Sequence, residues 1–132
     1  MKSFIILILV FCTGCATVST LDIISTDMEN SLNACSGKAT KQTILMQAGR
    51  PTHKEIINGR EIWIYEYKKT EGYSTTTGTG SIFFPHETKQ KWQDYQLRVS
   101  IGFNQAGVMH DWSYNGHITV FSNNPFRTLK CQ

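Results

Sequence analysis

The sequence predicts an α+β domain in which two short N-terminal helices pack on a three-stranded antiparallel sheet. Apolar residues at helical spacing come first, segments with strict alternation of apolar and polar residues follow, and turn signals separate them. The 132 residues suffice for one domain and exclude a large dinucleotide-binding or barrel enzyme. The net charge of +3, from 13 basic and 10 acidic side chains, is too small to indicate nucleic acid binding.

Residues 1–14 have the character of a lipoprotein signal peptide. A short basic start precedes an unbroken apolar run, which is shorter than the roughly 20 residues that a membrane-spanning helix needs. Two small residues then stand directly before Cys15, as they do before the acylated cysteine of a bacterial lipobox, although Cys12 stands where an aliphatic residue is usual. Ordinary secretory cleavage after Ala16 is the alternative, and both routes export the chain.

The lipoprotein interpretation divides the chain into three parts. Cys15 becomes the lipid attachment site, residues 15–25 form the lipidated N-terminus and tether, and residues 26–132 form a single domain with a C-terminal tail. Ala16 is not the aspartate that favours inner-membrane retention in enteric bacteria, so we expect a periplasm-facing position at the outer membrane. The several acyl chains of a bacterial lipoprotein make such anchoring stable.

Two cysteines remain once Cys12 has left with the signal peptide and Cys15 has taken lipid. Cys35 and Cys131 are then an even pair in an oxidising compartment, which favours a disulfide between them. A bridge that closes a loop of this length contributes about 4 to 5 kcal/mol in the chain-entropy model. The alternative is a buried free Cys35 and a loose Cys131 on the tail.

Both helices are expected at the start of the domain. The first should cover roughly residues 27–35, because Thr26 and Glu29 have the spacing of a capping box and an apolar stripe follows. The second should run from an N-cap at Thr40 to a stop at Gly49. The helix positions expected to face the sheet are Met28, Leu32, Ile44 and Leu45.

Three strands are expected to follow the helices. Residues 61–68, 95–103 and 108–114 each alternate in polarity, as half-buried antiparallel strands do. An Asn-Gly turn signal at 58–59 leaves open a small additional hairpin before the first of them. The strand residues expected to face the helices are Leu97, Val99, Ile101 and Phe103.

Two groups of side chains are candidates for partner binding. Trp63 and Tyr65 lie on one face of the first strand, where they either pack beneath the helices or are exposed to a partner. The Thr/Ser/Gly-rich segment 70–90 is expected to be a mobile loop that carries partner specificity, unless its rings fold back over an open sheet face. The candidate contacts in this segment are Tyr73, Phe83 and Phe84.

No catalytic or cofactor-binding pattern is evident. The four histidines, His53, His86, His110 and His117, have no metal-ligand spacing with one another or with cysteine. A structural Cys35 is favoured over a nucleophilic one, and the glycines at 78–80 lack the lysine of a phosphate-binding loop. We therefore expect a non-enzymatic protein with no catalytic residues, no metal and no cofactor.

Several segments occur in an order that points to a known family. Residues 37–40 precede the second helix and 48–52 end it, 62–65 begin a strand, and 97–104 with 107–108 form a final hairpin. This order resembles the SmpA/OmlA family, which comprises the small lipoprotein of the outer-membrane β-barrel assembly machinery and its BamE-like relatives. The resemblance covers about residues 26–116.

This resemblance has consequences for fold and function. It implies two helices against a three-stranded antiparallel sheet. It also implies an envelope protein partner, with the β-barrel assembly machinery as a candidate, and a role in outer-membrane protein assembly or envelope maintenance. The same fold also serves in inhibitors, so a periplasmic inhibitor or ligand-binding module is the alternative.

Overall fold

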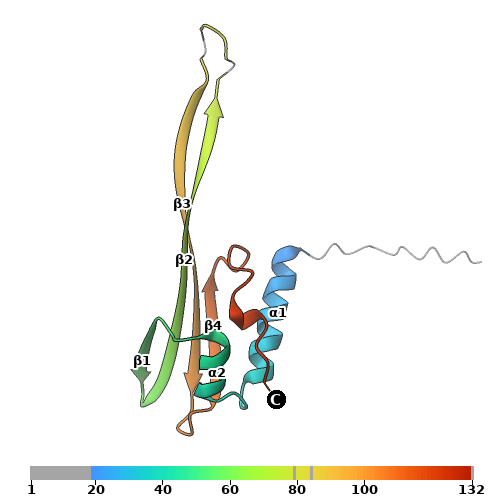
Figure 1. The fold of residues 1–132 in the computed structure, drawn as a ribbon, viewed down its shortest axis with the longest axis vertical. Coiled ribbons are helices and arrows are strands. Elements are labelled where there is room, and N and C mark those ends of the chain that lie inside the picture. The colour runs from blue at the N-terminus through green and yellow to red at the C-terminus, as the bar shows by residue number, and fades with distance from the viewer. Residues whose placement is uncertain (1–18, 79, 84, 132) are drawn as a thin grey trace, which may run out of the picture.

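The computed structural model describes residues 19–78, 80–83 and 85–131. Its four strands form one antiparallel sheet in the order β1-β2-β3-β4, so the predicted count of three strands is wrong, although the α+β class is compatible (Figure 1). In chain order the elements are α1 (Thr20–Cys35), α2 (Lys41–Ala48), β1 (His53–Ile57), β2 (Arg60–Thr77), β3 (Glu87–Phe103), β4 (Met109–Gly116) and the short 3-10 helix η1 (Pro125–Arg127).

The additional strand is β1, at the edge of the sheet. It pairs with β2 through a two-residue turn, in which Ile57 is opposite Arg60. Asn58 and Gly59 in this turn have φ values of 53° and 75°. Positive φ at both central residues is the requirement of a tight turn that matches the twist of the strands, and Asn-Gly meets it best. The hairpin that the turn signal left open is therefore formed.

The first helix is longer than predicted. Ser19 is its N-cap: the Ser19 hydroxyl accepts from the backbone N–H of Asp22, and the Asp22 carboxylate accepts from that of Ser19. The added turns bury Ile24, which extends the apolar stripe toward the N-terminus. Residues 20–25, which we expected in the tether, therefore belong to α1, and Thr26 lies inside the helix.

The second helix has the bounds that its end signals predict. The Thr40 hydroxyl accepts from the backbone N–H of Thr43, at 3.3 Å. Gly49 ends the helix with φ 77°, a conformation that costs glycine little because it has no Cβ. Ile44 is fully buried and anchors this short helix in the core.

The predicted face of β3 is confirmed as the core face. Leu97, Val99, Ile101 and Phe103 are each 0% exposed, and they share one cluster with the helix residues Met28, Leu32 and Ile44, against which Leu45 packs. The rings of β2 complete this core. Trp63 packs edge-on against Phe103 with centroids 4.8 Å apart, and Tyr65 packs against Phe126 at the same distance.

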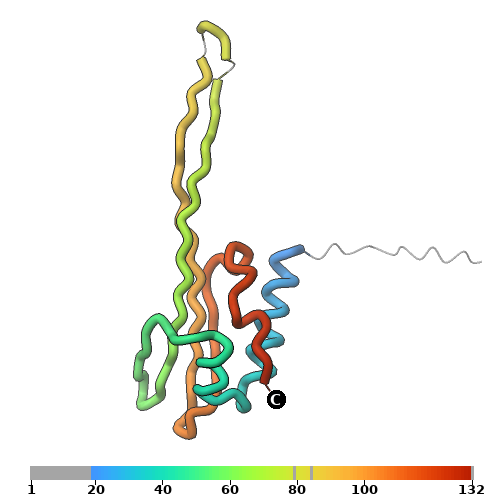
Figure 2. Tube along the Cα trace, in the orientation of Figure 1, coloured from blue at the N-terminus to red at the C-terminus, as the bar shows by residue number. Residues whose placement is uncertain are grey.

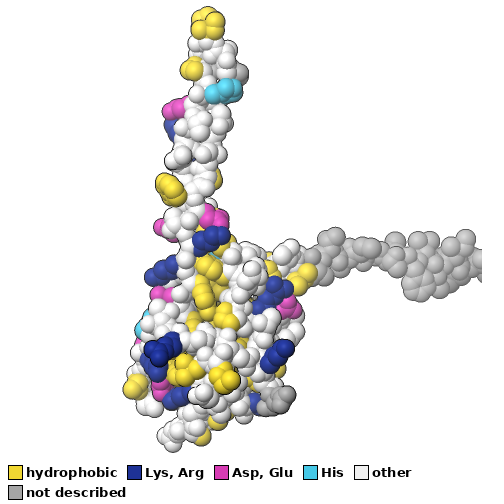
Figure 3. All heavy atoms as spheres, in the orientation of Figure 1, with side chains coloured by type: hydrophobic (Ala, Val, Ile, Leu, Met, Phe, Trp, Pro, Cys, Tyr) yellow, Lys and Arg dark blue, Asp and Glu magenta, His cyan; other side chains and the backbone are white. Residues whose placement is uncertain are grey.

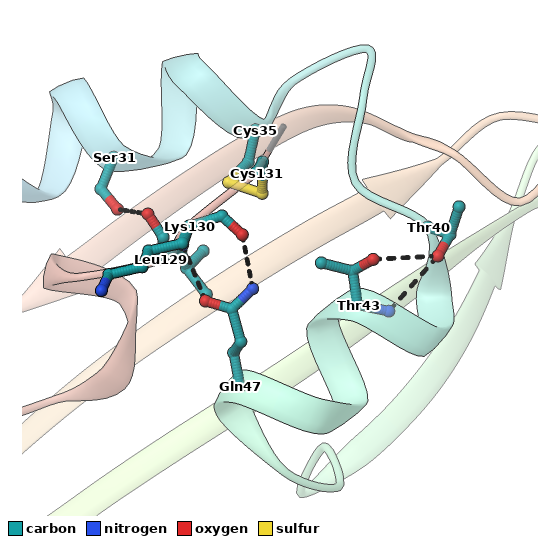
Figure 4. The surroundings of a disulfide bond; sticks show 8 residues. All are labelled: Ser31, Cys35, Thr40, Thr43, Gln47, Leu129, Lys130 and Cys131. Atoms are coloured by element: carbon teal, nitrogen blue, oxygen red, sulfur yellow. Dashed lines mark hydrogen bonds between the residues drawn. A yellow bond between two sulfur atoms is a disulfide. The ribbon is translucent and has the colours of Figure 1, made fainter.

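The C-terminal tail is tied to both helices, as Figure 4 shows. The predicted disulfide is present: Cys35 and Cys131 are bonded, with Cα atoms 5.1 Å apart. Gln47 holds the backbone of Lys130 on two sides, because its amide nitrogen donates to the carbonyl at 2.6 Å and its oxygen accepts from the N–H at 2.7 Å. The tail also adds apolar side chains to the core that no sequence pattern indicated, namely Ile118, Phe126 and Leu129.

Strands β2 and β3 continue as a two-stranded hairpin far beyond the rest of the molecule (Figures 1 and 2). Their pairing runs without a register shift from the core out to Thr77 opposite Glu87. The prediction of a loop over residues 70–90 is therefore wrong for most of its length. We call the part of β2 and β3 from the pair Lys68 and Gln96 outward the ribbon, and residues 80–83 its tip.

Candidate partner-binding ribbon

The ribbon grows out of the core without changing its alternation. On β2 the odd-numbered row that begins with the buried Trp63 and Tyr65 continues into exposed positions. Beyond the core both faces of the ribbon meet solvent, because none of its paired residues from Lys68 to Thr77 and from Glu87 to Gln96 is buried. Its two edges are free as well, because β1 pairs with β2 only as far as Ile64 and β4 pairs with β3 only from Leu97. Side chains on either face of the ribbon are therefore accessible to a partner.

Polar cross-strand contacts line the ribbon. Thr70 donates to the carboxylate of Asp94 at 2.7 Å, and the hydroxyls of Thr76 and Thr88 lie 3.4 Å apart. Ion pairs join Lys69 to Glu71 and Lys89 to Glu87 along each strand. Such exposed pairs contribute little to stability, so the backbone ladder and β-forming side chains hold the ribbon together.

One aromatic ring covers a glycine in the middle of the ribbon. Gly72 lies opposite Trp92, and a Cβ atom added to Gly72 would stand 2.7 Å from Cζ3 of that ring. The indole therefore occupies the space that a side chain at position 72 would fill, an arrangement known to compensate for glycine in strands. Trp92 is still 71% exposed, so the outer surface of its ring is free for contact.

The tip of the ribbon carries its most exposed apolar side chains. Ile82 is 96% exposed and Phe83 85%, and Tyr73 on the shaft is 47% exposed. Figure 3 shows hydrophobic atoms at the outermost end of the molecule and along the shaft. Large apolar groups displayed away from a core are typical of interaction surfaces. Phe84, the other predicted contact, lies outside the described residues.

The rings of the other candidate group, Trp63 and Tyr65, are buried. Trp63 is 2% exposed and Tyr65 3%. The indole N–H of Trp63 donates to Glu61 at 2.6 Å, and the Tyr65 hydroxyl donates to the Gly49 carbonyl at 3.0 Å. Burial raises the pKa of Tyr65. Of the two orientations considered, the structure has the one in which these rings are core residues, so they offer no surface to a partner.

An open hollow of about 520 Å³ lies where the ribbon leaves the sheet. Its walls include Lys68, Lys69 and Asp94, and Tyr95 meets His117 edge-on at 5.3 Å beside it. Charged, solvent-exposed walls differ from the enclosed apolar clefts that bind most small molecules. The ribbon itself is therefore the better candidate for a functional surface.

The remaining findings concern possible metal sites, membrane-spanning helices and similarity to known proteins. In the part of the chain that the structure describes, no three His, Cys, Asp or Glu side chains gather so that they could hold a metal ion. None of the described helices is long and apolar enough to cross a membrane. Cys15 lies outside the described residues.

The chain matches no protein-family model, no curated protein and no solved structure, so the resemblance to SmpA/OmlA stays a prediction.

Proposed function

We propose that this chain is a non-enzymatic lipoprotein of the bacterial envelope that acts through protein–protein contacts made by the ribbon. The observation that carries the proposal is the projection of the ribbon beyond the core, with Trp92, Ile82 and Phe83 each more than two-thirds exposed. Tryptophan in particular is enriched among the few residues that carry most of the binding energy of protein interfaces, and exposed apolar side chains beside it add area that a partner can cover.

Energetics support a binding role for the ribbon. An isolated two-stranded hairpin is marginally stable in water, and none of the described residues of the ribbon is buried. Its exposed apolar surface therefore does not serve the fold, whereas a partner that covers it would gain the free energy of removing that surface from water.

Two features support a place in the envelope. The disulfide between Cys35 and Cys131 suits an oxidising compartment. The segment before Cys15 has the pattern of a lipoprotein signal, which would anchor the protein at the outer membrane. The resemblance to SmpA/OmlA adds outer-membrane protein assembly or envelope maintenance as the process served, with the β-barrel assembly machinery as the candidate partner.

Recovery of partners from detergent-solubilised envelopes tests the proposal. The wild-type protein is compared with a tip variant, Ile82→Ser with Phe83→Ser, and with a matched control, Ile56→Ser. Ile56 is 78% exposed but lies on β1, away from the ribbon. We expect the tip variant to lose its partner and the control to keep it. Equal recovery by all three proteins would contradict a role for the tip.

The alternative function is that of a periplasmic inhibitor or ligand-binding module. The observation that favours it is the narrow tip with Ile82 and Phe83 at its end, a shape that can enter the cleft of another protein. The same recovery experiment separates the two functions. Barrel-assembly subunits among the recovered proteins support the first, and a periplasmic hydrolase supports the second.

A further inference from the structure

The outward direction of the β2 backbone can be read from contacts at the base of the ribbon. The carbonyl of Ile64 accepts from the N–H of Thr52 at 2.8 Å, and the N–H of Glu66 donates to the Thr52 hydroxyl at 2.9 Å. Thr52 precedes β1, so these β2 groups point away from β3. Because backbone groups alternate sides along an antiparallel strand, the even-numbered residues of β2 present their N–H and C=O groups outward.

The opposite strand has the same alternation. The carbonyl of Gln96 on β3 accepts from the N–H of His117 at 2.8 Å, so it points away from β2. Even-numbered residues of the two strands are opposite one another, as Gly72 and Trp92 are, and so form the non-hydrogen-bonded pairs of the ladder. Beyond Glu66 the outward-facing residues of β2 are Lys68, Thr70, Gly72, Ser74 and Thr76.

This edge of β2 lacks the devices that keep strand edges from pairing. From Thr70 to Thr76 the outward-facing residues carry no charge and include no proline, and the pairing with β3 has no bulge. Lysines, prolines and bulges are the usual protection of an exposed edge. The corresponding row on β3 differs, since it contains Asp94 and the bulky Trp92.

We propose that the β2 edge from Thr70 to Thr76 binds an extended segment of the partner as an additional strand. This inference rests on the proposed function and names the way in which the partner binds. The added strand continues the row that β1 begins on the same edge of β2. Backbone hydrogen bonds provide the affinity in this mode of recognition, and pockets for alternate side chains provide the selectivity.

The covered glycine defines the selectivity of this edge. A residue of the added strand that lies opposite Gly72 meets no side chain there and reaches the exposed ring of Trp92 instead. An apolar or aromatic residue gains most from that contact. The partner segment is therefore an extended strand with a large apolar side chain at this position and small or polar side chains beside it.

A second copy of this chain fits the edge less well. Suppose that two copies pair antiparallel along all the outward-facing residues of β2 from Lys68 to Thr76. The two-fold axis then passes near Gly72, and residue 78 of each copy lies opposite Glu66 of the other. The tip of each copy would then collide with Thr52 of the other, because the Thr52 hydroxyl already accepts a hydrogen bond from the N–H of Glu66. It also brings two Trp92 rings to the axis. A partner with a free strand avoids both conflicts.

Photo-crosslinking in envelopes of cells that export the full chain tests this inference. A benzophenone amino acid replaces Thr76 beside the β2 edge or, in a second protein, Thr88 beside the β3 edge. The first protein is combined with Ser74→Pro, which removes one outward N–H and leaves the ladder with β3 intact. Matched controls are Ser74→Ala, which keeps that N–H, and Gln90→Pro, which removes an outward N–H from the other edge.

We expect the benzophenone at position 76 to crosslink to one defined segment of a partner. Ser74→Pro should reduce the crosslinking yield about tenfold, because it removes one backbone hydrogen bond to the added strand and disturbs the close steric fit beside it. Ser74→Ala and Gln90→Pro should keep the yield, and all variants should retain the disulfide and the melting temperature. A crosslink from Thr88 alone, equal loss with Gln90→Pro, or a crosslink to a second copy of this chain would overturn the inference. If the tip variant loses its partner while Ser74→Pro keeps it, the proposed function stands and strand addition fails.

Discussion

Glu61 links the second helix to the sheet at the level of single side chains. Its carboxylate accepts from Lys41 of α2 at 2.5 Å and from the Trp63 indole at 2.6 Å, and Lys54 lies 3.7 Å away. The hydrogen bonds from Lys41 and Trp63 lower the pKa of Glu61 below its ordinary value. The ionised carboxylate thus accepts a hydrogen bond from the N–H of a buried ring and forms an ion pair with the side chain of the first residue of α2.

The lowered pKa predicts a contribution of Glu61 to acid stability. A carboxyl whose pKa is lower in the folded protein stabilises it above the unfolded value of 4.5, and this contribution is lost as pH falls through the folded pKa. Between about pH 5 and about pH 3, the melting temperature of the wild type should therefore fall more steeply than that of Glu61→Gln. Glu71→Gln, on the ribbon, is the control that should keep the wild-type slope. Parallel slopes for wild type and Glu61→Gln would contradict this role.

Removal of a core side chain should be costly. Ile101 is 0% exposed and lies between Trp63 on β2 and Trp112 on β4 in the strand register. Ile101→Ala should lower the free energy of unfolding by about 2 to 5 kcal/mol, measured by chemical denaturation. Ile56→Ala, at a 78% exposed position, should change it by less than about 0.5 kcal/mol. Similar losses of unfolding free energy from both substitutions would mean that the burial of Ile101 does not make its removal more costly.

At the scale of elements, local end signals predicted some boundaries well. Thr40 and Gly49 bound α2 because each residue provides a specific backbone requirement of a helix end. The start of α1 was predicted wrongly, since two capping boxes compete in the sequence. The Ser19 box prevails over that at Thr26 because the longer helix also buries Ile24.

The ribbon was missed because the main sequence signal for a strand is one-sided burial. Its faces are both exposed, so residues 70–77 show no alternation of apolar and polar side chains. The remaining signal was composition, since threonine, tyrosine and tryptophan favour strands even where nothing is buried. Whether the rings of this region are exposed or fold back over the sheet was left open by the sequence, and the structure exposes Tyr73 and Phe83.

An irregularity in β4 also lay beyond pattern analysis. Simple alternation puts His110 on the same face as Trp112. The structure pairs Phe103 with Met109 and Gly102 with Asp111, so His110 is passed over and Met109 enters the core. A bulge of this kind depends on the partner strand, which a single strand sequence does not specify.

The disulfide should stabilise the tail and, through it, both helices. The bridge joins residues separated by 96 positions and closes a loop over the whole described sheet. Cys35→Ser with Cys131→Ser should lower the free energy of unfolding by about 2 to 5 kcal/mol, measured by denaturation of oxidised wild type and variant. Free-thiol labelling of the denatured, non-reduced wild type checks the bridge itself. Labelling at either cysteine would contradict it.

Shortening the ribbon should leave the core stable. An Asn-Gly turn in place of residues 72–92 joins Glu71 to Gln93, a pair that the ladder already brings together. The melting temperature should change little, because loop length affects closure by only about 0.6 kcal/mol per doubling and none of the described residues that are removed is buried. Partner recovery should be lost. Unfolding of this variant would show that the ribbon supports the sheet, and the contact surface would have to be sought elsewhere.

For the whole molecule, α1 and the ribbon share one end. The Ser25 hydroxyl lies 2.8 Å from that of Tyr114, near the end of β4 where the ribbon begins, while Gly37 after α1 donates to Met109 at the other end. Figure 1 likewise shows the start of α1 at the end of the body from which the ribbon rises. A lipid anchor at the proposed Cys15 site, which precedes α1, would therefore hold this end toward the membrane.

The anchor itself gives the last prediction. The four steps along the chain from Cys15 to Ser19 span at most about 14 Å, whereas the nine steps of the ribbon from Lys68 to Thr77 extend about 30 Å. An acylated Cys15 would hold the body so close to the bilayer that the ribbon is confined to the layer next to it, where an envelope partner would meet the tip. Intact-mass analysis of the processed protein should find an acylated N-terminal cysteine, and Cys15→Ser should abolish acylation and leave the protein unprocessed or released. An unmodified N-terminus at Thr17 would instead show that the ordinary secretory site is used and that the ribbon is free to act anywhere in the periplasm.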